Sequence, residues 1–394
     1  MTAGARVTPG LTDIAAALSL AAWLYLLLFH GRFWRADQRL PRDLPAPPAW
    51  PDVVAVIPAR NEADVVGRAV RSVLGQRYRG RLRVVVVDDR SDDGTAAAAR
   101  RGAAASGHPP GRFEVVAGRP LPPGWAGKVW AMHQGVSHAE RTMPAASYVW
   151  LTDADVEHDP DELARLVAMA RGGQYDLVSL MVRLHCRQGW ERLLIPAFVF
   201  FFQKLYPFPR VNRARSRVAG AAGGCMLLRR RALRRIGGLE AIRGAVIDDC
   251  ALARAVKPGG RVWLGLTAAT RSLRPYDGLG GIWDMVARSA YTQLRHQPLL
   301  LLATVAGMVL VYLVPPAALA AGSGWTAAAG GLACLIMASV YLPTLRLYGL
   351  PACFGLSLPL AGLLYALMTV DSARRHYAGR RDQWKGRRYA PQAG

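Results

Sequence analysis

Two long apolar blocks, one near each end of the chain, limit what this sequence can fold into. Leu11 to Phe29 is an apolar run of roughly membrane-spanning length, and its one charge, Asp13, lies near its start. It lacks a basic leader and a small-residue cleavage site, so we interpret residues 1–30 as a retained transmembrane anchor rather than a signal peptide. The second block, 299–370, is interrupted by proline and glycine and predicts about three spans, roughly 299–320, 325–343 and 350–370.

The positive charge of the chain lies beside these apolar blocks. The net charge is +23 over 394 residues, and arginines gather in a basic, proline-rich linker at 31–50 and in a basic tail at 371–394. This pattern is typical of a protein that lies against anionic membrane lipids on the cytoplasmic side. Nucleic acid is not favoured as a partner, because no basic helix carries interleaved base-stacking aromatics. Five cysteines without C-x-x-C spacing are predicted to be buried thiols in a reducing compartment.

The membrane topology has two solutions. The positive flanks predict that residues 30–298 face the cytoplasm, with the N-terminus outside. Three further crossings would then place the basic tail outside, against the positive-inside rule. Either one segment, such as the interrupted 350–370, is re-entrant, or the tail departs from the rule. An amphipathic helix on the membrane surface is predicted at Gly280 to Gln297, within a segment 272–298.

Between the two blocks, residues 51–271 alternate strand and helix patterns. Asp52 to Ile57 and Arg81 to Val87 are predicted as buried strands, each followed by a helix, at about 63–74 and 96–105. This order predicts an α/β domain with a parallel sheet that binds ligands at the carboxyl ends of its strands. Neither a G-x-G-x-x-G motif nor a P-loop motif occurs, so neither a dinucleotide-binding fold nor a P-loop fold is indicated. For the apolar stretch Glu191 to Phe208, core packing and a membrane-facing wall both remain open.

Acidic residues follow two of the predicted strands. Asp88 and Asp89 end the second strand, and Asp153 and Asp155 follow the apolar run Tyr148 to Leu151. A carboxylate at such a position can accept hydrogen bonds from a ribose or a base. Two carboxylates on a short loop suit Mg²⁺ or Mn²⁺ that also holds a diphosphate. Turn and helix-cap chemistry is the alternative for each pair.

Several motifs, taken in order, resemble the family 2 glycosyltransferases. They are Pro58-Ala-Arg-Asn-Glu62, Val87 to Thr95, Gly127-Lys128 with Gly135, Thr152-Asp-Ala-Asp155, Gly220 to Gly238 and Val246-Ile-Asp-Asp-Cys250. The resemblance covers roughly 52–298. It is nearest to the hopanoid-biosynthesis-associated branch, given the single N-terminal anchor and the run Ile247 to Ala253, and ceramide glucosyltransferases share the layout.

The resemblance implies a GT-A fold that uses a nucleotide-diphosphate sugar. The nucleotide-sugar-binding residues would be Pro58, Ala59, Glu62, Asp88, Asp89, Lys128 and Asp153. Asp155, together with Asp153, would hold the divalent metal, and Asp249 would be the catalytic base with Asp248 beside it. Inverting transfer requires both a base for the acceptor hydroxyl and a cation for the departing diphosphate. Helix capping is the alternative for Asp248-Asp249, which open a predicted helix through Val256.

The sequence departs from the family pattern at two places. His133 stands where the Lys-x-x-x-x-Asn pattern has asparagine, and Gln293-Leu-Arg295-His296 replaces the Gln-x-x-Arg-Trp motif. Four other histidines have no partner at metal-ligand spacing and are predicted as surface or loop residues: His108, His138, His158 and His185.

The leading hypothesis is a multi-pass enzyme of the bacterial inner membrane, with its catalytic domain in the cytoplasm. It would be an inverting glycosyltransferase that moves one sugar onto a lipid acceptor, for which a hopanoid is the candidate. The alternatives are a processive polysaccharide synthase and a catalytically inactive GT-A scaffold. The first requires more spans and an intact Gln-x-x-Arg-Trp motif, and the second requires a lost motif acid, whereas Asp89, Asp153, Asp155 and Asp249 are all present.

Overall fold

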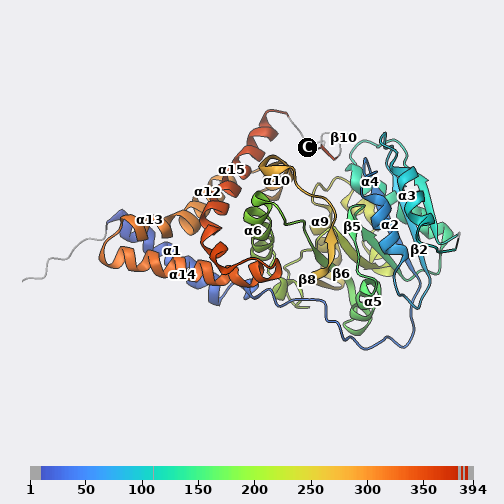
Figure 1. Ribbon diagram of the computed structural model, residues 1–394, viewed down its shortest axis with the longest axis horizontal. Coiled ribbons are helices and arrows are strands. Elements are labelled where there is room, and N and C mark those ends of the chain that lie inside the picture. Colours follow the sequence, from blue (N-terminus) through green and yellow to red (C-terminus); the bar gives the residue numbers. More distant parts are fainter. Residues whose placement is uncertain (1–9, 110, 380–382, 385–386, 389–394) are drawn as a thin grey trace, which may run out of the picture. The chain divides into compact units, whose positions relative to one another are not determined.

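The computed structural model describes residues 10–109, 111–379, 383–384 and 387–388, which divide into two compact units (Figure 1). The helical unit comprises the described residues of 10–36, 186–207 and 277–379. The sheet unit comprises 37–185 and 208–276, and the short tail strands are grouped with it. Of the regions assigned from sequence, residues 1–9 of the anchor and 380–382, 385–386 and 389–394 of the basic tail lie outside the described residues.

The sheet unit is built on eight strands. They are β1 (Val53–Ala59), β2 (Leu82–Asp88), β3 (Phe113–Ala117), β4 (Tyr148–Thr152), β5 (Val156–Glu157), β6 (Tyr175–Arg183), β7 (Cys225–Arg229) and β8 (Arg261–Ser272). Their order is β3-β2-β1-β4-β7-β6-β8-β5. The first four are mutually parallel, as predicted, but β7 runs antiparallel to both β4 and β6, so the sheet is mixed rather than wholly parallel.

The parallel half of the sheet brings three strand ends to one edge. Val56 of β1 pairs with Val85 of β2 and with Leu151 of β4, so the carboxyl ends of these strands lie side by side. All residues of β1 are buried, as expected for a strand covered on both faces. This edge therefore carries Ala59, Asp88 and Thr152, followed by the predicted ligand loops.

Helices cover this sheet. They are α2 (Val66–Leu74), α3 (Thr95–Ala104), α4 (Gly127–Thr142), α5 (Glu162–Gly172), α7 (Phe208–Val211), α8 (Arg230–Arg235) and α9 (Asp248–Val256), with 3₁₀ turns at Gly238–Ile242 and Lys257–Gly259. Helix α4 packs closely on the sheet because Gly135 has no side chain: a Cβ there would overlap Val56 and Val87. This close packing places the first turn of α4, with Lys128, at the carboxyl edge of the strands.

The helical unit contains the apolar segments. Its elements are α1 (Leu11–Leu28), α6 (Gly189–Leu205), α10 (Gly278–Ala287), α11 (Ala290–Gln293), α12 (Pro298–Met308), a π-helical turn (Val309–Leu313), α13 (Val314–Ala321), α14 (Gly324–Leu347) and α15 (Leu358–Tyr377), with 3₁₀ turns at Phe33–Arg35 and Ala352–Ser357. Four segments are long and apolar enough to cross a membrane: Leu11–Leu28, Pro298–Ala321, Gly324–Leu347 and Ala352–Tyr377. Within this unit, α1 packs along α13 and α14 (Figure 1).

The first C-terminal span continues past Pro315-Pro316, where the sequence suggested an interruption. Pro315 has no N–H to donate, so the carbonyl four residues earlier, at Val311, loses its helical partner. The indole of Trp23 donates to that carbonyl at 2.7 Å. A side chain of α1 thus satisfies the π-helical turn, as apolar surroundings require.

Several local expectations differ from the structure. The predicted amphipathic helix over 280–297 is two short helices, α10 and α11, separated at Arg288-Ser289. Stretch 191–208 forms most of α6, which is grouped with the apolar helices and not with the sheet. Of the five cysteines, only Cys225 and Cys250 are buried, and Cys353 is exposed. The backbone of the tail pairs Gln383–Trp384 (β9) with Arg387–Arg388 (β10).

Candidate active site

The loops after β1 and β2 are joined by hydrogen bonds between backbone and side chains. The backbone N–H of Asn61 donates to Ser91 Oγ at 3.0 Å, and that of Glu62 donates to Thr95 Oγ1 at 2.8 Å. In return, the N–H of Asp92 donates to Asn61 Oδ1 at 3.2 Å. Ser, Asn and Asp side chains readily make such turn contacts. The two loops therefore form one surface at the sheet edge.

The predicted nucleoside residues lie on or under this surface. Asp89 is fully buried, and its N–H donates to the carbonyl of Ala59 at 2.8 Å. Pro58 lies inside buried β1 and pairs with Val87. Asp88 is half-buried and accepts the N–H of Ser91 at 3.1 Å, so its carboxylate is used at least partly in the turn.

Lys128 stands at the centre of the acidic cluster. Its ammonium lies 2.7 Å from Asp153 Oδ1 and 3.7 Å from Asp248 Oδ2. Burial alone would lower the pKa of Lys128, but the charges of Asp153, Asp248 and Asp249 outweigh it and raise the pKa. The lysine is therefore a permanent cation that joins the loop after β4 to the start of α9.

Asp249 is held by two backbone donors. The N–H of Gly223 donates to its Oδ2 at 2.8 Å, and the N–H of Cys250 donates to its Oδ1 at 2.6 Å. Burial, followed by repulsion from Asp248, raises the pKa of the Asp249 carboxyl to about 6, against the attraction of Lys128. A carboxylate with this pKa is ionised at neutral pH and more basic than an ordinary aspartate, as suits a general base.

Arg274 joins the two halves of the site and was missed by the sequence reasoning. Its guanidinium is ion-paired with Glu62, and its Nε lies 3.5 Å from Asp155 Oδ2. Ser272 Oγ donates to the same Asp155 oxygen at 3.3 Å. Arg274 follows β8 and lies in the segment 272–298, which the sequence analysis assigned to a membrane-surface helix. The structure thus brings together Glu62, Asp155 and the Lys128 cluster through two cations.

The acidic loop fits a divalent cation that shares its ligands with a substrate. Burial and the negative charge of Asp153 raise the pKa of Asp155, so a cation beside the pair would relieve an existing repulsion. Among the described residues, no three His, Cys, Asp or Glu side chains are grouped to hold a metal ion. Mg²⁺ is commonly bound by one or two carboxylates together with substrate phosphates. Asp153 and Asp155 meet that description.

The structure places three histidines that the sequence analysis singled out. His158 is buried, and its Nε2 lies 2.7 Å from Thr152 Oγ1. Burial lowers the pKa of His158 to about 3, so its ring is neutral. His138 lies in α4 and contacts Glu114 Oε2 at 2.8 Å. His133, at the asparagine position of the family pattern, packs its ring against Trp125 and Trp130.

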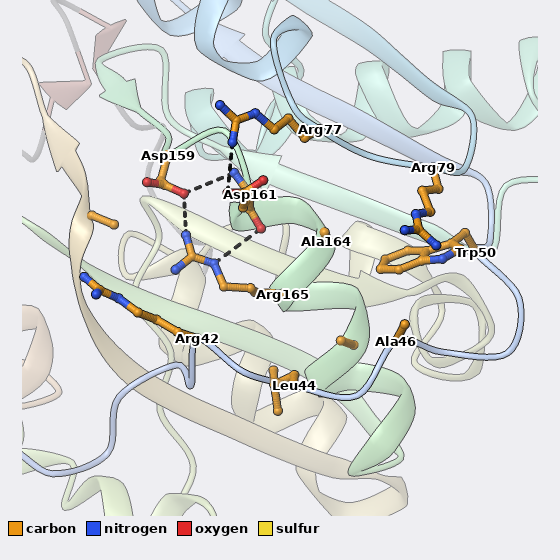
Figure 2. Close-up of a pocket in the computed structure, with 12 residues that line it drawn as sticks. Arg42, Leu44, Ala46, Trp50, Arg77, Arg79, Asp159, Asp161, Ala164 and Arg165 are labelled. Atoms are coloured by element: carbon orange, nitrogen blue, oxygen red, sulfur yellow. Dashed lines mark hydrogen bonds and ion pairs between the residues drawn. The ribbon is translucent and has the colours of Figure 1, made fainter.

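A hollow of about 480 Å³ lies elsewhere in the sheet unit (Figure 2). Trp50 and Arg79 on its wall precede β1 and β2, so it belongs to the edge opposite the acidic loops. Arg165 pairs with Asp159 at 2.5 Å inside it. Its other arginines are exposed to solvent, which screens their charge, and we assign it no ligand.

Comparisons with known proteins match part of this chain to a family and its fold to solved structures. Residues 54–237 match the model of the family described as glycosyl transferase family 2. A search of curated proteins finds no match. A mannosyltransferase from Pyrobaculum calidifontis, solved in complex with GDP-mannose and Mn²⁺, is 22% identical with a TM-score of 0.56, and the alignment covers 91% of this chain and 99% of that one.

Two further solved structures are more distant. TarS from S. aureus is 13% identical with a TM-score of 0.40, and the alignment covers 61% of this chain and 40% of that one. Mannosyl-3-phosphoglycerate synthase from Rubrobacter xylanophilus is 20% identical with a TM-score of 0.37, and the alignment covers 62% of this chain and 75% of that one. The family match and the fold similarity to the mannosyltransferase agree with the mixed sheet and its acidic edge. Residues 54–237 therefore match glycosyl transferase family 2, and the mixed α/β sheet of the chain has a GT-A-like fold.

Proposed function

We propose that this protein is a glycosyltransferase that moves a sugar, with inversion, from a nucleotide-diphosphate donor to a lipid acceptor. The observation that carries the proposal is the cluster around Lys128. There, carboxylates from the loop after β4 and from the first turn of α9 meet one half-buried ammonium at the carboxyl edge of the sheet. One side of the cluster has the groups for a donor diphosphate, and the other has a base for an acceptor hydroxyl.

On the donor side, Asp89 and the loop from Ala59 to Glu62 bind the nucleoside, and Asp153 and Asp155 hold the divalent cation. That cation, when bound, supplies positive charge to the departing diphosphate. Lys128 and Arg274 lie 2.7 Å from Asp153 and 3.5 Å from Asp155, so they add positive charge at the same place. Mn²⁺ with GDP-mannose, present in the similar mannosyltransferase structure, is the first pair to test.

On the acceptor side, Asp249 takes the proton of the acceptor hydroxyl. The hydroxyl oxygen forms a bond to the anomeric carbon while the bond from that carbon to the diphosphate oxygen breaks. The proton ends on Asp249, and the electron pair of the broken bond leaves with the nucleoside diphosphate. The N–H groups of Gly223 and Cys250 hold Asp249 in place, and burial, Asp248 and Lys128 set its basicity.

The apolar helices and the charge support the proposed lipid acceptor and location. Four helices are apolar enough to cross a membrane, and arginines flank them. We propose that the enzyme lies in the bacterial inner membrane against anionic lipids, with its catalytic unit in the cytoplasm, where nucleotide sugars are made. A hopanoid is the acceptor to test first, because the motifs resemble that branch.

The donor site is tested by Asp155→Ala in the purified full chain. We expect this variant to lose turnover and the Mn²⁺ dependence of GDP-mannose or UDP-sugar binding, while it still folds and inserts. Asp43→Ala, an exposed aspartate of the linker, is the matched control and should behave like the wild type. Wild-type turnover by Asp155→Ala would remove the acidic loop from the mechanism.

The acceptor is tested by mass spectrometry of lipids from cells with the wild-type protein, with Asp155→Ala and with neither. A lipid that gains one sugar mass only with the wild type would identify the acceptor class. If lipids are unchanged while a polysaccharide accumulates, the lipid acceptor is wrong and the processive alternative is favoured.

A further inference from the structure

A short chain of hydrogen bonds adjoins the acidic loop. Thr152 ends β4 and directly precedes Asp153, and its hydroxyl donates to the carbonyl of Gly224 at 2.9 Å. The same hydroxyl oxygen lies 2.7 Å from His158 Nε2. The exposed fractions of Thr152 and His158 are 1% and 4%, so water does not compete for these bonds.

The direction of each bond follows from the number of protons. A threonine hydroxyl has one hydrogen, and here it points to the Gly224 carbonyl, which can only accept. The contact with His158 therefore requires that Nε2 carries the hydrogen and donates to Thr152. The Nδ1 atom is then an acceptor, and it receives no hydrogen bond from the residues that the structure describes.

The Gly223-Gly224 dipeptide connects this chain to the proposed base. The Gly224 carbonyl also accepts the N–H of Asp153 at 3.4 Å, and the N–H of Gly223 donates to Asp249 Oδ2 at 2.8 Å. A Cβ on Gly223 would lie 3.1 Å from the ammonium of Lys128 and 3.4 Å from Asp249 Oδ2. The dipeptide is thus packed directly against both groups.

We propose that Thr152 and His158 are a positioning pair that fixes the Asp153–Asp155 loop to Gly223-Gly224, and thereby fixes the metal carboxylates relative to Asp249. Neither residue contacts the reacting atoms, so both act through Asp153 and Asp249. The inference rests on the proposed function, because it assigns those acids their roles.

Because Nδ1 has no partner among the described residues, we infer that the imidazole is retained for its Nε2 hydrogen. A buried polar atom without a partner costs free energy that an apolar side chain of similar size would avoid. The ring also packs edge-on against Trp150, 4.5 Å between centroids, a contact that an apolar side chain could make. The bond to Thr152 is the interaction that an apolar side chain cannot replace.

The test compares Thr152→Val with Thr152→Ser in the purified full chain. Valine keeps the shape but removes both hydrogen bonds, whereas serine keeps the hydroxyl. Loss of such supporting contacts typically weakens metal binding by about 10–100-fold. We expect that loss of Mn²⁺ affinity, measured by electron paramagnetic resonance with GDP and separately with UDP, for Thr152→Val, and restoration by Thr152→Ser. Thr142→Val, an exposed threonine at the end of α4, should leave Mn²⁺ affinity unchanged.

A second pair keeps the proposal testable if Thr152→Val does not fold. His158→Gln can place an amide N–H near the position of Nε2, and His158→Leu cannot. The glutamine variant should bind Mn²⁺ more tightly than the leucine variant, at similar apparent melting temperatures. Equal Mn²⁺ affinity for the folded members of both pairs would overturn the positioning role.

Asp155→Ala in the same Mn²⁺ assay distinguishes a failure of the positioning pair from a failure of the proposed metal site. If Asp155→Ala loses Mn²⁺ binding but Thr152→Val does not, only the positioning pair is wrong. If Asp155→Ala binds Mn²⁺ like the wild type, the proposed metal site itself is wrong, and the positioning pair falls with it.

Discussion

At the scale of single residues, the two acids at the start of α9 have different surroundings. Asp249 accepts N–H groups from Gly223 and Cys250, whereas Asp248 Oδ2 accepts no hydrogen bond from the described residues and lies 3.7 Å from the Lys128 ammonium. Asp248 therefore faces the Lys128 ammonium, and the surroundings of Asp249 suit its proposed role in proton exchange.

The substitution Asp249→Asn should lower kcat by about 10²–10⁴-fold, the usual contribution of a general base. Nucleotide-sugar affinity should barely change, because the base acts on the acceptor. Asp248→Asn should reduce kcat less. Steady-state kinetics and donor titration measure the two quantities separately. Weaker donor binding with an unchanged kcat in Asp249→Asn would make this residue a donor contact or helix cap.

The pH dependence of the rate tests the same residue independently. A base must be ionised, and burial with repulsion from Asp248 raises the pKa of Asp249 to about 6. The wild-type kcat/KM should therefore be constant above this pKa and fall as pH decreases through about 6. The residual activity of Asp249→Asn should lack this acidic limb. If the limb persists in that variant, another group whose pKa is raised, such as Asp155, controls it.

At the scale of elements, the contact between α2 and α3 depends on two glycines. A Cβ on Gly102 of α3 would overlap the carbonyl of Gly67 on α2. This contact supports the loop from Asp88 to Thr95, because α3 begins where that loop ends.

Gly102→Ala should destabilise the sheet unit by about 1–3 kcal/mol through overpacking. Gly172→Ala is the matched control, because Gly172 is also helical and a Cβ there meets no atom within 4 Å. That control should be neutral or more stable by up to roughly 1 kcal/mol from helix propensity. Apparent melting temperatures of the purified chain compare the two, and equal values would contradict the close contact.

The elements also show which parts of the fold and the site could be predicted from the sequence. β1, β2 and β4 were predictable because runs of β-branched, aromatic and other apolar residues end at proline or aspartate. The strand ends indicated Asp88, Asp89, Asp153 and Asp155, and the resemblance supplied the roles of the acids. The antiparallel β7 was not predicted, since its pairing with β4 joins residues far apart in sequence. His158 was misassigned because a search for metal-ligand spacing overlooks a hydroxyl partner such as Thr152. Arg274 was missed among many arginines, because only the fold brings it to Glu62.

At the scale of the whole molecule, contacts inside the helical unit address the membrane topology. The end of α15 packs against the segment that precedes α12 (Figure 1). Trp283 Nε1 donates to Asp371 Oδ2 at 2.8 Å, and Arg375 pairs with Asp284 at 2.7 Å. The N–H of Tyr291 donates to Ser372 Oγ at 3.0 Å.

These contacts favour the re-entrant solution. Residues 277–297 follow the sheet unit before any further span, so they lie on the same side of the membrane as that unit. Groups in hydrogen-bond contact cannot lie on opposite sides of a hydrocarbon core about 30 Å thick. We therefore infer that α15 returns the basic tail to the cytoplasmic side, in agreement with the positive-inside rule.

Cysteine labelling from outside intact cells tests this topology. The natural Cys225 and Cys250 are buried and would be silent from either side. Reporters must therefore be introduced at exposed positions after Cys186, Cys334 and Cys353 have been replaced by serine. Ser323→Cys, between α13 and α14, should react with an impermeant maleimide from outside. Arg100→Cys on α3 and Ala378→Cys at the end of α15 should react only after the cells are opened. Reaction of Ala378→Cys from outside, with Arg100→Cys still protected, would show that α15 crosses the membrane. Reaction of Arg100→Cys from outside would place the catalytic unit on the wrong side for a cytoplasmic nucleotide sugar.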